Sequence, residues 1–270
     1  MIRAYYDSHI HSTFSCDGKS AVEEYSALID AGILQGIGFA EHVDLMPECG
    51  SYEFLDHGQY LKEIQHFRDR GYEFYAGGEV DYAKKAEQEI KEHLKRYRYA
   101  FTICSVHMID GVSISDRVFI PSLKDRNELM CIIEKYYSEL KLSLNAGIFD
   151  VIGHIGVYKR HLGDIFHGNS KIKGYVKEAE YEMARICAQS DMILEVNTSG
   201  LFSPLAQTLP GEAFLKLYYY FGGRTVCIGS DAHTSADAGK GIETAYSILQ
   251  QTGFDYITLP WDRENPVRIK

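Results

Sequence analysis

The stretch DSHIHSTFSCDG, residues 7–18, carries two histidines one residue apart, His9 and His11, with Asp7 before them and Asp17 after them. Imidazole nitrogens and carboxylate oxygens are ligands for divalent metal ions such as Zn²⁺ and Mn²⁺. Residues two apart on a β-strand point to the same face, so Asp7, His9 and His11 would project together. A single H-x-H pair is weak evidence, and its meaning depends on the rest of the chain.

Ligand-type residues also end each of the other strand candidates. They are Glu41 and His42, Glu79 and Asp81, His107, His154, Glu195 and Asn197, and Asp231 and His233. In a closed parallel barrel the carboxyl ends of all strands meet at one mouth. Residues more than 200 positions apart would then lie together and form a metal cluster. Histidines in predicted helices, such as His57 and His93, are expected to face solvent.

The kind and number of these ligands indicate the chemistry. Histidines and carboxylates without thiolates suit Zn²⁺, Mn²⁺ or Fe²⁺. The six strand-end histidines, Glu79, Asp231 and Asp17 make nine candidate ligands, too many for one four-coordinate ion but suitable for two or three ions that share a bridging carboxylate. Two metals ~3.5–4 Å apart stabilise both oxygens of a phosphoryl displacement. The chain has neither a glycine-rich phosphate loop nor a G-x-S-x-G motif.

Short strand-like runs alternate with longer helical ones along the chain. The strand candidates are IRAYYDSHI, GIGFAEH, EFYAGGEVD, YAFTICSVH, FDVIGHI, MILEVNT and TVCIGSDAH. Helices are predicted around residues 20–32, 58–70, 83–95, 128–144, 175–189, 212–221 and 241–251. Ser20 and Glu23 have the spacing of a capping box at the first of them. This alternation predicts an α/β fold with parallel strands, and the strand-end ligands favour a TIM-like barrel.

Length and composition limit the class of protein. The 270 residues show no linker or composition shift, which indicates a single domain, 1–270. A net charge of −10 argues against a nucleic-acid partner, because such proteins cluster Lys and Arg. No stretch approaches the ~18 apolar residues of a membrane helix, and no N-terminal signal is present, so no membrane partner is expected. Six cysteines without a C-x-x-C pair indicate reduced thiols and a cytoplasmic protein.

The segments DSHIHSTFSCDG, AEH, GGEVD, SVH, IGH and GSDAH appear in that order along nearly the whole chain. Together they resemble the PHP (polymerase and histidinol phosphatase) family. The length and the segments SVHMIDG, FDVIGHI and EVNTSGL resemble its histidinol-phosphatase branch most. The resemblance implies a distorted seven-stranded (β/α) TIM-like barrel, a trinuclear metal centre and phosphomonoesterase activity, which is a hydrolase function.

The resemblance also implies a role for each ligand. One metal would bind His9, His11, Glu79 and Asp231, a second would bind the bridging Glu79 with His107 and His154, and a third would bind Asp17, His42 and His233. The expected reaction is hydrolysis of L-histidinol phosphate to L-histidinol and phosphate, in histidine biosynthesis, by a metal-bridging hydroxide. Glu79, Asp231 and His233 are the expected catalytic residues, and the general acid is unassigned. Asp7 is expected to orient a histidine from behind the ligands.

The substrate, a small phosphorylated metabolite, needs further contacts. Arg160, Lys159, Arg117 and Asn197 are the expected ones, with Arg160 preferred because arginine binds phosphate bidentately. Phe202 stands where the resemblance predicts a basic residue, which leaves the exact phosphoester open. The ammonium and imidazole of histidinol phosphate would be attracted by acidic residues, and the candidates are Asp44, Glu48, Glu53 and Asp81.

Three alternatives remain open. A relative acting on another small phosphoester, such as a nucleotide or sugar phosphate, would keep the same ligands. An amidohydrolase-type barrel also begins with H-x-H, but it wants a metal-bridging lysine where this chain has Glu79 and His107. A non-catalytic metal-binding module would keep the fold without turnover. Neither the metal identity nor the oligomeric state follows from the sequence.

Overall fold

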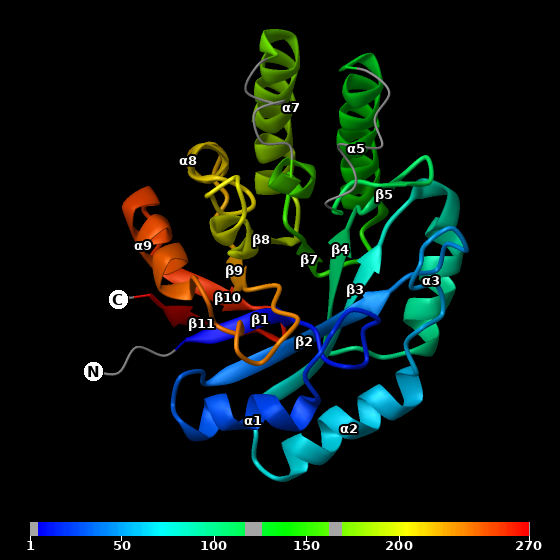
Figure 1. The fold of residues 1–270 in the computed structure, drawn as a ribbon. Coiled ribbons are helices and arrows are strands. Elements are labelled where there is room, and N and C mark those ends of the chain that lie inside the picture. Colours follow the sequence, from blue (N-terminus) through cyan, green and yellow to red (C-terminus); the bar gives the residue numbers. More distant parts are fainter. Residues whose placement is uncertain (1–4, 117–125, 162–168, 270) are drawn as a thin grey trace.

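Seven parallel strands form one sheet in the order β1-β2-β3-β4-β7-β8-β9 in the computed structural model, which describes residues 5–116, 126–161 and 169–269 (Figure 1). The strands are β1 Tyr6–Ile10, β2 Gly36–Val43, β3 Phe74–Asp81, β4 Phe101–Ser105, β7 Val151–Ile152, β8 Ile193–Asn197 and β9 Val226–Gly229. The first strand and the segment after the last also pair, so the sheet curls into a nearly closed barrel. The predicted α/β, distorted seven-stranded TIM-like barrel is confirmed.

Helices surround the barrel on its outside (Figure 1). They are α1 Val22–Asp30, α2 His57–Asp69, α3 Glu87–Arg96, α5 Arg126–Ala146, α7 Ser170–Gln189, α8 Glu212–Tyr220 and α9 Ile242–Thr252, with 3₁₀ turns η1 Lys84–Ala86, η2 Val157–His161 and η3 Ser199–Phe202. Their apolar faces are buried as the periodicity predicts; in α5, Ile133, Tyr137 and Leu140 are at most 1% exposed. Among the helices of the described ranges, none is long and apolar enough to cross a membrane.

The start of α1 differs from the predicted capping box by one residue. The helix begins at Val22, and the Glu24 carboxylate, not that of Glu23, accepts a hydrogen bond from Ala21 N at 2.7 Å. Ser20 Oγ donates to the same carboxylate at 3.2 Å. Because Ala21 is the cap residue, the reaching-back position is Glu24.

The seam between β1 and β9 closes the barrel next to the predicted ligands. Asp231 N donates to the His9 carbonyl at 2.7 Å, and His11 N donates to the Ala232 carbonyl at 2.8 Å. At Gly229 a β-carbon would lie 2.4 Å from His9 Cβ, so this approach of the two strands requires glycine. The seam thereby holds the N-terminal histidines against the Asp231 segment, more than 200 residues away in sequence.

Two antiparallel hairpins accompany the barrel: β5 Met108–Ile109 with β6 Val112–Ser113, and β10 Tyr256–Leu259 with β11 Asp262–Arg268. In the second hairpin the Trp261 ring stacks on Tyr75, with 4.5 Å between ring centroids, and lies 5.6 Å from the Phe101 ring. Tyr75 and Phe101 lie at the beginnings of β3 and β4. The hairpin therefore packs at the end of the barrel opposite the ligand residues.

Two histidines outside the barrel mouth are not solvated as expected. The Tyr99 hydroxyl lies 2.7 Å from His57 Nδ1 and 3.0 Å from His93 Nε2, and both rings are partly buried. Burial lowers the pKa of His57, and burial together with His57 and Arg96 lowers the pKa of His93 to about 4. These histidines therefore form a neutral polar contact between α2 and α3, and the prediction that they face solvent is wrong.

Candidate metal centre

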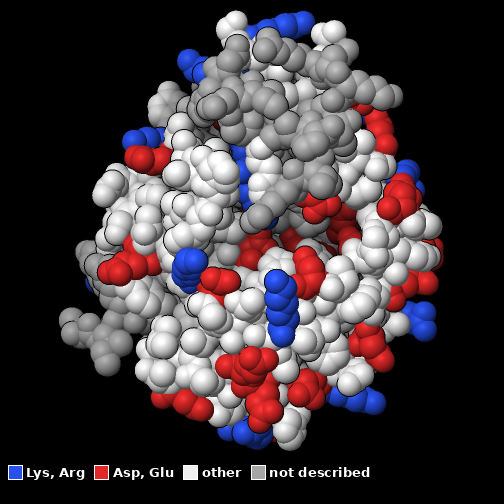
Figure 2. All heavy atoms as spheres, in the orientation of Figure 1, with Lys and Arg blue, Asp and Glu red and all other residues white. Residues whose placement is uncertain are grey.

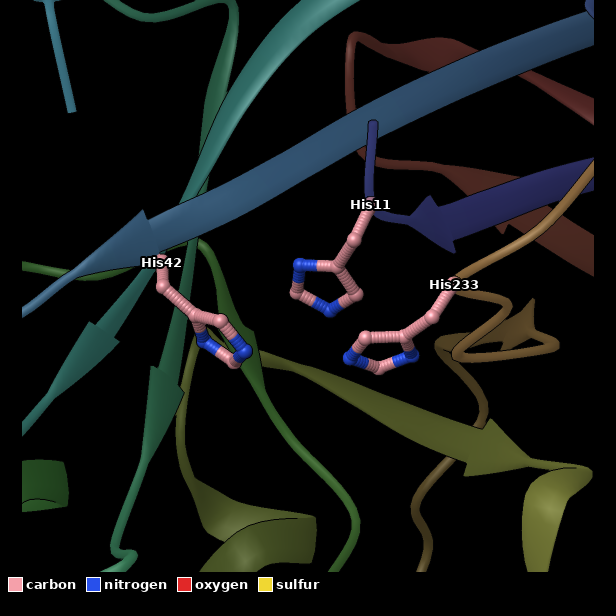
Figure 3. Close-up of side chains that lie close together, drawn as sticks. All are labelled: His11, His42 and His233. Carbon is pink, nitrogen blue, oxygen red and sulfur yellow. The ribbon is translucent and has the colours of Figure 1, made fainter. Parts of the chain in front are cut away.

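The nine predicted metal ligands converge at the carboxyl ends of the strands. Each has a side-chain nitrogen or oxygen within 3.6 Å of another member. The set is His9, His11, Asp17, His42, Glu79, His107, His154, Asp231 and His233. Figure 3 shows His11, His42 and His233 reaching one region from the end of β1, from β2 and from the segment after β9. Their nearest ring nitrogens lie within 4.8 Å of one another.

Glu79 lies at the centre of the cluster. Its Oε1 is 2.6 Å from His154 Nε2 and 3.4 Å from His107 Nε2. Its Oε2 is 2.9 Å from His42 Nδ1 and 3.6 Å from His9 Nε2, yet it has no partner with hydrogen-bond geometry. Burial opposes ionisation, but the imidazoles of His107 and His9 hold the pKa of Glu79 well below its usual range. The two oxygens of one charged carboxylate thus face two groups of imidazoles, as a bridging ligand would.

The hydrogen bonds behind His9 and His11 decide which ring nitrogens carry protons. His9 Nδ1 lies 2.6 Å from Glu195 Oε1, and because a carboxylate only accepts, Nδ1 carries the proton. Ser15 Oγ donates to Glu41 Oε2 at 2.6 Å, so it accepts from His11 Nδ1 at 3.1 Å. In their neutral forms both rings point the lone pair of Nε2 at each other across 3.2 Å.

Two facing lone pairs repel unless a proton or a metal ion lies between them. Burial, with His42 and His233 nearby, lowers the pKa of His11 to about 3, so this ring is neutral near pH 7. Burial also lowers the pKa of His107 to about 3, and its Nε2 faces His154 Nε2 at 3.3 Å. Burial opposes a charge on His9, but the carboxylates of Glu195 and Glu79 raise its pKa well above the usual value. His154 Nε2 lies 2.6 Å from a Glu79 oxygen, a position that also favours a cation. Neutral His11 and His107, each facing a position that favours a cation, fit divalent metal ions.

A third group lies nearer the solvent. His233 Nδ1 donates to the Asp231 carbonyl at 2.9 Å, which leaves Nε2 facing Asp17 Oδ2 at 3.0 Å. His42 Nε2 lies 3.4 Å from Asp17 Oδ1. The His11 ring stacks between those of His42 and His233, with ring centroids 4.3 and 4.4 Å apart (Figure 3). Asp17 is half exposed, so this group stands at the entrance of the cluster.

Asp231 forms an ion pair with Arg160, which adds a positive charge beside the cluster. Arg160 Nη2 donates to Asp231 Oδ2 at 2.7 Å and to Ser199 Oγ at 2.7 Å. Burial would raise the pKa of Asp231, but the Arg160 guanidinium holds it well below its usual range. Asp231 has a φ of 57°, in the left-handed region that residues with a side chain seldom adopt, and such backbone strain is typical of functional sites. Arg160 Nε is buried without a hydrogen-bond partner among the described residues.

A cavity of about 400 Å³ opens over the cluster. Six of the candidate ligands and Arg160 line it, together with the buried carboxyls of Asp44 and Asp81. Burial raises the pKa of Asp44, and burial together with Asp44 raises the pKa of Asp81 well above its usual range. Figure 2 shows acidic side chains gathered in and beside the central hollow of this face.

The other predicted substrate contacts are placed differently. Lys159 pairs with Glu180 and lines a separate small hollow, because successive residues of a 3₁₀ turn point in different directions. Asn197 is fully buried, and its Oδ1 accepts from Ser199 N at 3.0 Å and Ser199 Oγ at 2.6 Å. Asn197 thus supports the serine that holds Arg160. Neither residue lines the cavity over the cluster, so substrate binding by Lys159 and Asn197 stays a prediction, and Arg117 lies outside the described residues.

Phe202, which replaces the basic residue that the resemblance predicts, has a cation beside it. Its ring is 55% exposed, and Lys240 Nζ lies 4.4 Å from the ring centroid. Lys240 also pairs with Asp237 at 3.3 Å. The segment after β9 therefore supplies a positive charge near this position from elsewhere in the sequence.

Two buried glutamates that the sequence analysis does not assign as site residues support the ligands. Glu195 Oε1 contacts His9 Nδ1, and its Oε2 accepts from His154 N at 2.6 Å. Glu41 accepts from Ser12 N at 3.0 Å and from Ser12 Oγ at 2.6 Å, and it also holds the serine behind His11. Carboxylates behind metal-bound histidines fix the ring orientation. Their position at strand ends, next to ligands, is the sequence signal for this role.

Asp7 is buried, but it does not orient an imidazole ring. Its carboxylate accepts from Ser230 N at 2.9 Å, Gly239 N at 2.8 Å and His9 N at 3.3 Å, and Ser230 Oγ donates to it as well. Asp7 ties the backbone of β1, including that of His9, to the segment that carries Asp231, and its predicted role in orienting a histidine stays a prediction.

Comparison with known proteins identifies the class of this barrel. The PHP domain family matches residues 7–199, which is well over half of the chain, and the chain belongs to this family. The predicted family resemblance is confirmed.

The individual proteins to which this chain is similar include histidinol phosphatases. A Clostridium acetobutylicum protein named "probable histidinol-phosphatase" is 25% identical over 254 residues, covering 91% of this chain and 92% of that protein. The Lactococcus lactis histidinol-phosphatase is 23% identical over 254 residues, covering 92% of this chain and 91% of that protein. A crystal structure of histidinol phosphate phosphatase from Lactococcus lactis, complexed with zinc, L-histidinol and phosphate, superposes with a TM-score of 0.81. At 22% identity it covers 96% of this chain and 98% of its own, and it shows the shared fold.

Proposed function

We propose that this chain is a metal-dependent phosphomonoesterase that hydrolyses L-histidinol phosphate to L-histidinol and phosphate. The observation that carries the proposal is the cluster of nine ligand-type residues at one barrel mouth, with the Nε2 atoms of facing imidazoles 3.2 and 3.3 Å apart beside the charged Glu79. Membership of the PHP family and relatives named as histidinol phosphatases over nearly their full length support the choice of substrate. Six free cysteines support a cytoplasmic location.

The contacts support two or three divalent ions, for which Zn²⁺, Mn²⁺ and Fe²⁺ are the candidates. His9, His11 and Asp231 would hold one ion, His107 and His154 a second, and Glu79 would bridge the two; Asp17, His42 and His233 would hold a third. Bound there, the ions would neutralise charge on the phosphoryl oxygens and activate water. Glu195 and Glu41 keep Nδ1 of His9 and His11 protonated or hydrogen-bonded, so that Nε2 is the donor atom.

Arg160 would bind a phosphoryl oxygen. Its Nη2 is already committed to Asp231 and Ser199, while Nε is buried and has no hydrogen-bond partner among the described residues, and the side chain lines the cavity. A guanidinium held by one edge keeps its other N–H groups aimed in a constant direction. Ser199, fixed by Asn197, restrains the same edge. The arrangement binds and orients the phosphoryl group before bond cleavage.

A steady-state assay tests the proposal. Protein loaded with Mn²⁺ or Zn²⁺ is compared on L-histidinol phosphate, on nucleotide and sugar monophosphates and on p-nitrophenyl phosphate. We expect kcat/KM to be highest for L-histidinol phosphate and to disappear after chelation of the metal. A kcat/KM no higher than that of the generic ester would contradict the proposed substrate, and no turnover of any ester would contradict phosphatase activity itself.

Replacing Arg160 with methionine should lower kcat/KM about 100-fold, the size expected when a charge-assisted hydrogen bond worth ~2–3 kcal/mol is lost. The inhibition constant of inorganic phosphate should rise in parallel, because the same contact binds the product. Metal content by mass spectrometry separates a lost phosphate contact from a disturbed Asp231.

Lys159→Met is the matched control, since Lys159 pairs with Glu180 away from the cavity. It should leave both constants close to those of the unaltered protein. Equal losses in the two variants would assign the effect to the η2 turn and argue against a phosphate contact of Arg160.

A further inference from the structure

The η2 turn that carries Arg160 packs against a group of buried tyrosines. Tyr136 and Tyr137 lie on α5, and Tyr158 lies on the turn itself. Each of these three residues is 1% exposed. The Tyr136 and Tyr158 rings meet edge to face, with 5.0 Å between their centroids, and the Tyr137 and Tyr158 hydroxyls lie 3.1 Å apart. The turn is therefore fixed against α5 by both apolar and polar contacts.

One hydroxyl of this group bonds to the backbone where the turn begins. Gly156 N donates to Tyr136 Oη at 2.7 Å, and the Gly156 carbonyl accepts from Lys159 N at 2.9 Å. Gly156 is buried and has a φ of 90°, in the region that favours glycine. A buried N–H without an acceptor is costly, so the hydroxyl takes the place that water would have at an exposed turn. Tyr136 thereby fixes the peptide from which η2 starts.

Arg160 is anchored at the tip of its side chain but not along its length. Its Nη2 is held by Asp231 and Ser199, whereas Nε, which lies nearer the backbone, is buried and has no hydrogen-bond partner among the described residues. Because one end of the guanidinium is fixed, the direction of Nε depends on where the Arg160 backbone lies. That backbone follows Gly156 by four residues of a 3₁₀ turn, which rises ~2 Å per residue, so a shift of the Gly156 peptide moves it directly.

We infer that Tyr136 is a positioning residue for Arg160, and that its hydroxyl sets the direction in which the unpartnered Nε–H group meets a phosphoryl oxygen. The inference rests on the proposed function, because that oxygen is the proposed ligand. Tyr136 is not among the residues that line the cavity, so it acts on phosphate only through the η2 turn. Gly156 also lies two residues after His154, so a disturbed metal ligand is the competing route that the experiment has to separate.

Replacing Tyr136 with phenylalanine in the metal-loaded protein keeps the ring contacts and leaves the Gly156 N–H without its acceptor. The inhibition constant of inorganic phosphate should rise about 10-fold, and kcat/KM for L-histidinol phosphate should fall by a similar factor, mainly through KM. In the Arg160→Met background the same substitution should change both constants less than about two-fold, because the residue through which it acts is already gone. Equal losses in the two backgrounds, or a loss of bound metal by mass spectrometry, would overturn the inference by assigning the effect to the fold or to His154.

Tyr218→Phe is the matched control. Tyr218 on α8 is as buried as Tyr136, and its hydroxyl donates to the Thr225 carbonyl at 3.0 Å just before β9, at the end of the barrel opposite the metal ligands. This variant should leave the inhibition constant unchanged. If Tyr136→Phe fails to fold, Tyr137→Phe frees Tyr158 without leaving a backbone N–H unpaired, and it should raise the constant about 3-fold. A constant equal to that of the unaltered protein in the variant that is used would overturn the inference.

Nuclear magnetic resonance follows the Arg160 Nε–H group without turnover and so separates this inference from the proposed function. In zinc-loaded protein labelled with ¹⁵N-arginine, the Nε–H signal that disappears in Arg160→Met belongs to this residue. Its exchange with solvent should be at least about 10-fold faster in Tyr136→Phe than in the unaltered protein or in Tyr218→Phe. Faster exchange supports the positioning role even if no ester is hydrolysed, in which case the proposed function alone fails. Unchanged exchange contradicts the role, even if the phosphatase assay succeeds.

Discussion

Replacing Glu79 with glutamine is expected to lower kcat at least ~10³-fold, about 4 kcal/mol of activation free energy, and to reduce the bound metal. Glu79 Oε1 faces His107 and His154, and its Oε2 faces His9 and His42. An amide of the same shape removes the negative charge at the centre of these imidazoles. The amide also has an N–H₂ group, which would face the ring nitrogens of His107 and His154 in one orientation and those of His9 and His42 in the other. Either orientation therefore disrupts one of these two metal-binding positions.

Metal content by mass spectrometry and kcat at saturating Mn²⁺ or Zn²⁺ measure this effect together. Glu73→Gln is the control, because Glu73 is exposed just before β3 and contacts Tyr75, away from the mouth. A Glu79→Gln protein that keeps its full metal content and more than a tenth of the kcat would show that Glu79 does not bridge the ions. Reduced metal content with Glu73→Gln would point to a general effect on the strand.

The barrel mouth was predictable because one rule connects local pattern to three-dimensional position. Strand length and side-chain alternation place His42, Glu79 and His154 at strand ends, and parallel strands bring those ends together. The rule needs no knowledge of contacts between distant residues. Asp17 lies in a loop after β1, where side-chain alternation does not predict direction. Its place near His42 and His233 followed only from the family resemblance.

Side-chain direction in turns and the partners of buried polar groups were not predictable in the same way. Lys159 and Arg160 are neighbours in sequence, but the η2 turn sends one to Glu180 and the other to Asp231. Asn197 has the alternation of a substrate contact, yet it is buried behind Ser199. These outcomes depend on which donors and acceptors happen to lie nearby after folding.

The C-terminal hairpin was missed for a different reason. Its second strand, Asp262–Arg268, contains four charged residues and Pro266, so it lacks the apolar alternation that marks a half-buried strand. Its anchors are the Trp261 ring, which contacts Tyr75 and Phe101, and the buried side chains of Ile257 and Leu259 in β10. Two apolar residues in a four-residue strand and one ring in a turn leave almost no periodic signal.

Replacing Asp7 with alanine should lower the free energy of unfolding by about 3 kcal/mol, although Asp7 contacts neither substrate space nor a ligand side chain. Its carboxylate accepts hydrogen bonds from Ser230, Gly239 and His9, so removing it leaves buried N–H groups unpaired. Burial raises the pKa of Asp7, so keeping this charge is itself costly. The expected loss is therefore smaller than the sum of the individual hydrogen bonds.

Urea unfolding followed by circular dichroism measures this change, with Asp237→Ala as the control. Asp237 is about half exposed in the same C-terminal segment and pairs with Lys240, so its loss should cost less than ~0.5 kcal/mol. Equal stability of the two variants would show that the Asp7 hydrogen bonds do not hold the seam.

Asp7→Ala should also weaken metal binding, because ligands from the N-terminal strand and from the segment after β9 meet at this seam. Ser230, which Asp7 holds, directly precedes Asp231, and His9 lies on the other side of the seam. Without the Asp7 hydrogen bond the Ser230 backbone is free to move, and Asp231 can relax from its strained left-handed conformation. The relaxed Asp231 carboxylate would no longer point at the metal position. We expect metal affinity to fall about 10- to 100-fold, as for residues that orient ligands from behind. Unchanged metal affinity alongside the lower stability would show that closure of the barrel and assembly of the metal centre are separate events.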